Sequence, residues 1–292
     1  MKKEKVIRMI KKRYVVNENI NINVMDYLIK HVGMSRNKVK SLFKYDNVLV
    51  NNKHVKYDYL VKRNDVVEIS DDVKVRTKLD IIHEDDDFLI INKPTHLITV
   101  GLKNDKSLYN MALEYMKAKT KNNKPNLYVL HRLDMETSGI VVFCKNRLLT
   151  LNMQDNWNKL VTKRIYTLVI ESGNYKKNDH IELYLKDNDN TVVTVTDKEN
   201  GKLAITDYKV LKENKNYALV EANIKTGRKN QIRVTFAHMG YPIIGDKKYY
   251  SRINPIKRLA LVANELEFIN PDNNKRYKIS VDVPKEFIKI TN

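Results

Sequence analysis

Short apolar or alternating runs of four to twelve residues follow one another through residues 79–283, with Asn-, Asp- and Gly-rich turns between them. Runs of this length and period predict β-strands, and their hairpin spacing predicts mostly antiparallel neighbours. Helical patterns interrupt them at 107–119, 146–160 and 229–239, the last closed by Gly240. We therefore expect an α+β domain in which a few helices pack on a mixed, mostly antiparallel sheet.

Residues 24–70 follow a different pattern and predict a small, separate α/β unit. Its first helix is expected to bury one apolar face, formed by Met25, Leu28, Ile29 and Val32. A second helix is expected over 36–44, with Ser35 as its N-cap, followed by strands over 48–51 and 65–70.

Between the two patterns, the polar stretch 71–78 is interpreted as a linker. It divides the 292 residues into a domain at 1–76, which includes a basic N-terminal extension, and a domain at 77–292. Residues 1–76 hold 18 Lys and Arg against 9 Asp and Glu, in a chain whose net charge is +19. Such an excess indicates a polyanionic partner: RNA, DNA or an acidic membrane surface.

Composition also excludes some classes of protein. Cys144 is the only cysteine, so neither an internal disulfide nor a cysteine-based metal site can form. It lies in the apolar run 140–144 and is expected to be a small buried hydrophobe. No stretch approaches the ~20 apolar residues of a membrane span, and the basic start lacks the apolar core of a signal peptide. We expect a cytoplasmic monomer that makes no membrane contact.

Residues 131–139, HRLDMETSG, place one acid in a short polar loop between the apolar runs 127–130 and 140–144. A carboxylate between two core strands sits on a rigid platform, where a catalytic acid can be held at fixed geometry. This makes Asp134 the strongest candidate for catalysis. An ordinary strand connection with an ion pair between Asp134 and Arg132 is the alternative.

The motif HRLDxxTSG resembles the signature of the RluA-type pseudouridine synthases, which isomerise uridine in RNA. The resemblance implies that Asp134 is the catalytic residue. It also implies RNA contacts by His131, Arg132 and Thr137, with Arg132 filling the space that the flipped target base vacates. Because product and substrate are isomers, no cofactor and no metal are expected.

A second segment, RIY at 164–166, is similar to the basic-x-Tyr motif of the same family. By this resemblance Tyr166 packs on the target uracil and is placed for proton transfer, while Arg164 contacts RNA. Without it, Tyr166 would be interpreted as a half-buried strand tyrosine.

A third segment, TGRKNQIRVTFAHMGYPIIGD at 226–246, resembles the family's TGRxxQIRVHLAHxGHPxxGD. The match implies that Arg233 is the cation that pairs with Asp134, and that Arg228 and Gln231 line the RNA side. The alternative for Arg233 is a charge on a surface helix.

Four sites depart from the family pattern. The chain has Lys229-Asn230 in place of Thr-His, and Thr235, Val262 and His96 in place of His, His and Gly. None of these is expected to touch the proposed catalytic trio of Asp134, Tyr166 and Arg233.

The stretch that begins at Ser35 and closes with the DVVEI strand is similar to the small S-four RNA-binding domain, which often precedes an RluA-type catalytic domain. Basic residues recur on its second helix, where a solvated face would show the same pattern. The resemblance implies that these residues contact RNA: Arg36, Lys38, Lys40 and Lys44.

The sequence thus predicts an RNA pseudouridine synthase, with large-subunit ribosomal RNA favoured over transfer RNA as the substrate. Two alternatives stay open. One is an RNA- or ribosome-binding protein whose catalytic fold has lost activity. The other is an N-glycosidase, which would need a second acid to activate water, and Glu136 is the only nearby candidate.

Overall fold

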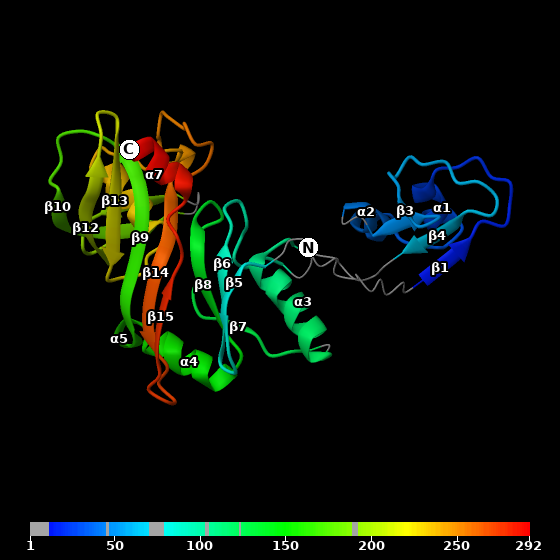
Figure 1. The fold of residues 1–292 in the computed structure, drawn as a ribbon, viewed down its shortest axis with the longest axis horizontal. Coiled ribbons are helices and arrows are strands. Elements are labelled where there is room, and N and C mark those ends of the chain that lie inside the picture. Colours follow the sequence, from blue (N-terminus) through cyan, green and yellow to red (C-terminus); the bar gives the residue numbers. More distant parts are fainter. Residues whose placement is uncertain (1–11, 45–46, 70–78, 103–104, 123, 189–191) are drawn as a thin grey trace. The chain divides into compact units, whose positions relative to one another are not determined.

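A computed structural model describes residues 12–44, 47–69, 79–102, 105–122, 124–188 and 192–292. The chain divides into two compact units, Met1–Lys78 and Leu79–Asn292, which are treated separately below (Figure 1). The stretch 71–78, interpreted as the linker, and most of the basic extension lie outside the described residues.

The first unit is a four-stranded antiparallel sheet with two helices. Its helices are α1 (Val24–Lys30) and α2 (Arg36–Lys44), as the sequence predicts. The sheet order is β1-β4-β2-β3, with the strands β1 (Lys12–Val15), β2 (Val48–Val50), β3 (Lys53–His54) and β4 (Val66–Ile69). The edge strand β1 is not predicted by the sequence. Its residues, KRYV, do not alternate clearly between apolar and polar, so they resemble the rest of the basic extension.

Local chemistry explains these elements. The Asn23 side chain caps α1 by accepting a hydrogen bond from the Asp26 N–H at 2.8 Å. Asn51 and Asn52 both have positive φ, 49° and 65°, which the tight turn between β2 and β3 requires. One apolar core lies between sheet and helices and includes Leu28, Val39 and Val67.

The second unit is built on one large sheet of order β11-β10-β12-β13-β9-β14-β8-β6-β5. The strands are β5 (Ile81–Glu84), β6 (Phe88–Lys93), β7 (Tyr128–Val129), β8 (Ser138–Cys144), β9 (Val161–Glu171), β10 (Asn178–Asp187), β11 (Val193–Thr196), β12 (Lys202–Glu213), β13 (Tyr217–Ile224), β14 (Leu261–Ile269) and β15 (Arg276–Ser280). Among the described strands only β8 and β14 pair in parallel, so the predicted mixed, mostly antiparallel sheet is confirmed.

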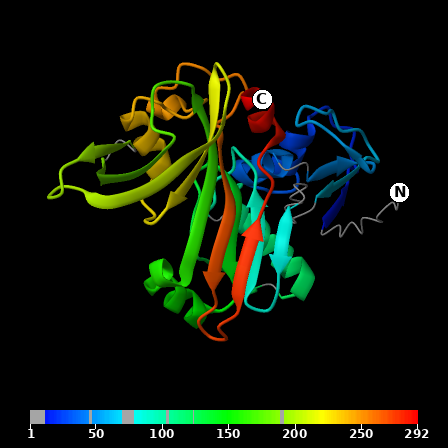
Figure 2. The same cartoon turned by 60° about the vertical axis from the view of Figure 1, so that its left-hand side comes forward.

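Helices cover the sheet: α3 (Leu108–Thr120), α4 (Arg147–Asp155), α5 (Trp157–Leu160), α6 (Gln231–His238) and α7 (Lys285–Thr291). Both views place α4 and α5 at one end of the long strands and α7 at the other (Figure 2). The single helix predicted over 146–160 is wrong, because the helix breaks at Asn156, which has ψ near 16° and caps both pieces. Cys144 is buried, as predicted.

The meeting of β8 and β14 explains one residue of the HRLDxxTSG motif. Ser138 pairs with Val262 and Gly139 with Ala263, and Gly139 has φ +121°. A Cβ at this position would lie 2.1 Å from the Ala263 carbonyl oxygen. Only glycine therefore permits the strand that follows the acidic loop to join β14.

Candidate active site

The acidic loop between β7 and β8 is braced by a second segment, 93–99, which begins at the last residue of β6. The Thr99 hydroxyl donates to the Leu133 carbonyl at 2.7 Å and accepts from the Leu133 N–H at 3.1 Å. Thr95 donates to the Glu136 carbonyl at 2.7 Å. The backbone on both sides of Asp134 is therefore fixed before any substrate arrives.

Lys93 completes this brace from inside the protein. It is fully buried, and its Nζ donates to the carbonyls of Leu97 at 2.7 Å and Met135 at 3.2 Å. Burial lowers the pKa of Lys93 to about 8, although the nearby charge of Asp134 opposes that change. His96, in the same segment, has φ 59°, so it occupies a left-handed conformation that glycine would adopt without cost.

Arg233 lies at the centre of a cluster of carboxylates. Its guanidinium donates from Nε and Nη2 to the fully buried Asp246, both at 2.7 Å. Nη1 donates to Asp134 Oδ2 at 3.2 Å, and Nη2 to Glu136 at 3.1 Å. Burial by itself would lower the pKa of Arg233. The hydrogen bonds to the carboxylates and their negative charges have the larger effect, so the pKa of Arg233 is raised. The predicted pairing of Arg233 with Asp134 is present in the structure.

Asn230 also contacts the predicted catalytic acid. Its Nδ2 donates to Asp134 Oδ2 at 2.5 Å, and its Oδ1 accepts from Lys248 at 2.7 Å and from the Tyr249 hydroxyl at 3.1 Å. The expectation that no departure from the family pattern touches the trio is wrong. Asn230 is 96 residues from Asp134 in sequence, so only the folded chain brings the two together.

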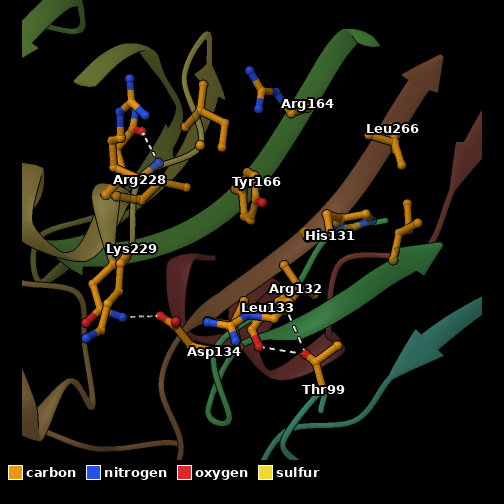
Figure 3. A pocket seen from close by; sticks show the side chains of 18 of the residues that line it. Thr99, His131, Arg132, Leu133, Asp134, Arg164, Tyr166, Arg228, Lys229 and Leu266 are labelled. Carbon is orange, nitrogen blue, oxygen red and sulfur yellow. Dashed lines mark hydrogen bonds between the residues drawn. The ribbon is translucent and has the colours of Figure 1, made fainter. Parts of the chain in front are cut away.

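Asp134, Asn230 and Arg233 border a pocket of about 700 Å³, a size that suits a small molecule or a nucleotide. Figure 3 shows Asp134, Tyr166 and Arg164 around it, with the latter two on β9. Burial, and then the charge of Asp134, raise the pKa of Tyr166 to about 12, although Arg164 opposes this. The phenol therefore keeps its proton at neutral pH.

Arg164, which is predicted to contact RNA, is largely buried in the structure. It is 8% exposed, and its Nη2 donates to the Lys225 carbonyl at 2.5 Å. Burial lowers the pKa of Arg164, and the nearby Tyr166 partly opposes this change. No described carboxylate pairs with the guanidinium. Its charge therefore reaches the pocket largely uncompensated.

His131 borders the pocket, and its predicted contact with RNA stays a prediction, but its described contacts are with the protein itself. Its Nε2 accepts a hydrogen bond from the Val142 N–H at 3.2 Å, and its ring lies 5.3 Å from that of Trp157. Burial, and then the charge of Arg164, lower the pKa of His131 to about 4. These contacts indicate a neutral imidazole that holds the loop against β8.

This state of His131 predicts a pH-dependent stability. Between pH 6.5, its ordinary pKa, and about 4, the folded protein binds fewer protons at this site than the unfolded chain does. Stability from this group is therefore lost as the pH falls through that range. In His131→Gln, where an amide oxygen can take the place of Nε2, urea unfolding should show a shallower loss than in the wild type. Parallel curves would contradict the assignment.

The other predicted RNA-side residues fall into two groups. Arg132 is exposed, and no described carboxylate pairs with it, which argues against the ion pair considered above. Arg228 is exposed as well, and its Nε donates to the Leu203 carbonyl at 2.9 Å. Thr137 and Gln231 border the pocket but are 2% and 3% exposed.

Gln231 is occupied by the protein itself. Its Oε1 accepts from the Thr226 hydroxyl at 2.8 Å and from the Arg228 N–H at 3.0 Å. Its Nε2 donates to the Ile205 carbonyl at 2.9 Å and to Thr206 at 3.0 Å. The Gln231 amide therefore fixes the turn before α6, and its predicted place on the RNA side stays a prediction.

On α2 of the first unit, Arg36, Lys38 and Lys40 are exposed. The side chain of Lys44 lies outside the described part of the structure. The apolar face of this helix points into the core through Val39 and Leu42, so the basic residues lie on its other faces. Their predicted contact with RNA stays a prediction.

Comparison with known proteins identifies the family. The family model for RNA pseudouridylate synthase matches residues 87–238. An uncharacterised RNA pseudouridine synthase of Mycoplasma genitalium is 31% identical over 261 residues, which covers 84% of this chain and 83% of the relative. Ribosomal large subunit pseudouridine synthase C of Rickettsia felis is 31% identical over 251 residues, covering 83% and 80%.

Among solved structures, human RNA pseudouridylate synthase domain containing 4 shares the fold, with a TM-score of 0.60 and 21% identity. The match covers 71% of this chain and 90% of that one. The chain belongs to the RNA pseudouridylate synthase family, and as an isomerase it converts uridine in RNA to pseudouridine.

The described residues contain no group of three or more His, Cys, Asp and Glu side chains arranged to hold a metal ion. No described helix has the length and apolar character needed to cross a membrane.

Proposed function

We propose that this enzyme modifies large-subunit ribosomal RNA, with Asp134 as the catalytic residue. The observation that carries the catalytic assignment is the arrangement around Asp134: a carboxylate on a braced loop, ion-paired to a buried arginine, at the edge of a pocket. Relatives named as ribosomal large subunit pseudouridine synthases favour ribosomal over transfer RNA. An enzyme that acts on ribosomal RNA needs to be where ribosomes are made, so the proposed substrate also favours a cytoplasmic location.

The reaction breaks the bond between C1′ of the ribose and N1 of uracil, turns the base over, and forms a bond from C1′ to C5. The proton that leaves C5 is balanced by one that N1 gains, so no redox reagent is consumed. Asp134 would act either on the sugar as a nucleophile or on a proton as a base. Arg233 donates a hydrogen bond to Asp134 Oδ2, so its guanidinium holds the carboxylate in place at the edge of the pocket.

Tyr166 and Arg164 would receive the base. The ring of Tyr166 offers a face on which uracil can stack, as aromatic side chains do for unstacked bases. Because its phenol is protonated, Tyr166 can take the C5 proton only as it gives up its own. Arg164, without a carboxylate partner among the described residues, would stabilise negative charge that develops on the detached uracil.

Arg132 would support extrusion of the target nucleotide. It is exposed, lies in the acidic loop two residues before Asp134, and lines the pocket. A planar guanidinium can stack on bases and bind phosphate together, so it can fill the gap that a flipped base leaves.

The geometry gives little support to an N-glycosidase. Such an enzyme needs a second carboxylate beside the first to activate water. Glu136 binds Arg233 at 3.1 Å and is absent from the described residues that line the pocket. Glu265, the other carboxylate among the residues that line the pocket, is ion-paired with Lys163 at 2.6 Å.

The first unit would add affinity by binding phosphates. If Arg36 and Lys40 bind RNA, the double variant Arg36→Ala/Lys40→Ala should bind more weakly and show a weaker salt dependence. The slope of log K against log[salt] should fall by roughly 0.7–0.9 for each phosphate that is no longer neutralised. A titration of the full-length protein from low to high salt measures this. An unchanged slope would show that these side chains face only solvent.

Pseudouridine mapping tests the substrate. Ribosomal and transfer RNA from cells with and without this gene should differ at sites in large-subunit ribosomal RNA. A difference confined to transfer RNA would overturn the substrate proposal and leave the enzyme class intact.

A further inference from the structure

Asp134 is held unequally through its two carboxylate oxygens. Oδ2 accepts from Asn230 Nδ2 at 2.5 Å and from Arg233 Nη1 at 3.2 Å. Within the described part of the chain no side chain or backbone N–H donates to Oδ1, and the Asp134 side chain is 30% exposed. An oxygen that already accepts two hydrogen bonds has little lone-pair density left for a new bond.

The orientation of the Asn230 amide follows from its other partners. Lys248 can only donate, so the atom that it contacts must be the oxygen. The Tyr249 hydroxyl accepts from the Val193 N–H at 3.2 Å, which leaves its own proton for Asn230 Oδ1 at 3.1 Å. Two donors therefore fix Oδ1 on one side, and Nδ2 must point to Asp134.

The backbone also commits Asn230 to this place. It is 7% exposed and has φ 53°, in the left-handed region that asparagine tolerates better than most residues. It is the residue just before α6, the helix that carries Arg233. The two donors to Asp134 Oδ2 thus come from one rigid corner of the fold.

We propose that Asn230 is a positioning residue that, with Arg233, ties down Asp134 Oδ2 and leaves Oδ1 as the oxygen that reacts with the nucleotide. Lys248 and Tyr249 act one step further out, because they hold the amide of Asn230 in the orientation that donates. This inference rests on the proposed catalytic role of Asp134. It concerns which oxygen reacts and what holds the other.

Two substitutions at Asn230 separate donation from simple packing. Asn230→Gly keeps the left-handed backbone and removes the whole amide. Asn230→Asp keeps the shape and the acceptor for Lys248 and Tyr249, but it removes the donor. The new carboxylate would either repel Asp134 or share a proton with it, and both outcomes weaken the reacting group.

The two roles therefore predict opposite orders of activity. If Asn230 positions Asp134, both variants should lose about 10²-fold in kcat, with Asn230→Asp at least as slow as Asn230→Gly, while RNA affinity stays within about twofold. If the residue only anchors Lys248 and Tyr249, Asn230→Asp should be clearly faster than Asn230→Gly. The measurements are single-turnover rates on an RNA substrate, RNA affinity by titration, and thermal unfolding to show that each variant is folded.

Asn274→Gly is the matched control. Asn274 has φ 57° in the exposed turn between β14 and β15, so it undergoes the same change outside the site and should keep the wild-type kcat. Near-wild-type rates at Asn230→Gly and Asn230→Asp, or a loss confined to RNA affinity, would overturn the inference. If Asp134→Asn is also active, the catalytic proposal fails as well; if it is inactive, only the role of Asn230 is wrong.

Discussion

Asp134→Asn is expected to abolish isomerisation, with a loss of at least about 10⁴-fold, while the fold and the affinity for RNA stay close to those of the wild type. The amide has the same shape and can present its oxygen to Asn230 and Arg233 in place of Oδ2. It can act neither as a nucleophile nor as a base. The measurement is conversion of uridine in RNA at a single turnover, with substrate binding followed separately.

Glu136→Gln is the control for that result. Glu136 lies in the same loop and binds the same guanidinium, so its amide removes equal charge from Arg233. We expect a loss of no more than about tenfold, because the Glu136 side chain binds Arg233 and is absent from the described residues that line the pocket. Equal losses in the two variants would mean that charge around Arg233, and not the chemistry of Asp134, governs the rate.

Arg233→Met should destabilise the protein by about 3–5 kcal/mol and remove activity. The substitution leaves Asp246 buried with no cation, and breaking a buried ion pair from one side costs this much. It also frees Asp134 from one of its two donors. The free energy of unfolding in urea gives the size of the effect.

The double variant Arg233→Met/Asp246→Asn tests the cause. Removing the stranded charge should recover part of the lost stability without restoring activity. If the two substitutions are simply additive, the cost of Arg233→Met arises from packing and not from the carboxylate of Asp246. Recovery of activity in the double variant would instead show that Arg233 is dispensable for the reaction.

Much of the fold follows from period and turn chemistry in the sequence. Buried strands such as β6 and β8 are continuous apolar runs, and their existence is therefore easy to predict. The break at Asn156 depends on local capping, and the short α7 packs against β9 and β13. Neither feature can be read from hydrophobic periodicity in the sequence. The exact ends of helices and strands could not be predicted for the same reason.

The candidate site also has a part that could be predicted from the sequence and a part that could not. Asp134 and Arg233 stand in motifs with few free positions, so the sequence points to them. The bracing of the acidic loop by Lys93 and Thr99 could not be predicted, because it joins side chains to backbone carbonyls that are neighbours only after folding. Asn230 left a signal, its departure from the family pattern, but the direction of its amide depends on tertiary contacts.

The place of β14 in the sheet has a consequence for biosynthesis. This strand is formed by Leu261–Ile269, far beyond β8 and β9 in the sequence, yet it lies between them in the sheet. During translation β9 is complete at Glu171, and its second partner, β14, is complete only after about a hundred further residues. At 5–20 residues per second that delay is roughly 5–20 s.

Until then, β8 and β9 present open edges to the solvent, where unpaired strand edges promote association with other chains. The acidic loop also lacks its final shape, since Gly139 pairs with Ala263. The enzyme thus becomes competent only after β14 has been made and has joined the sheet. A ribosome that stalls before residue 261 would release two half-sheets, the kind of product that chaperones and proteases remove.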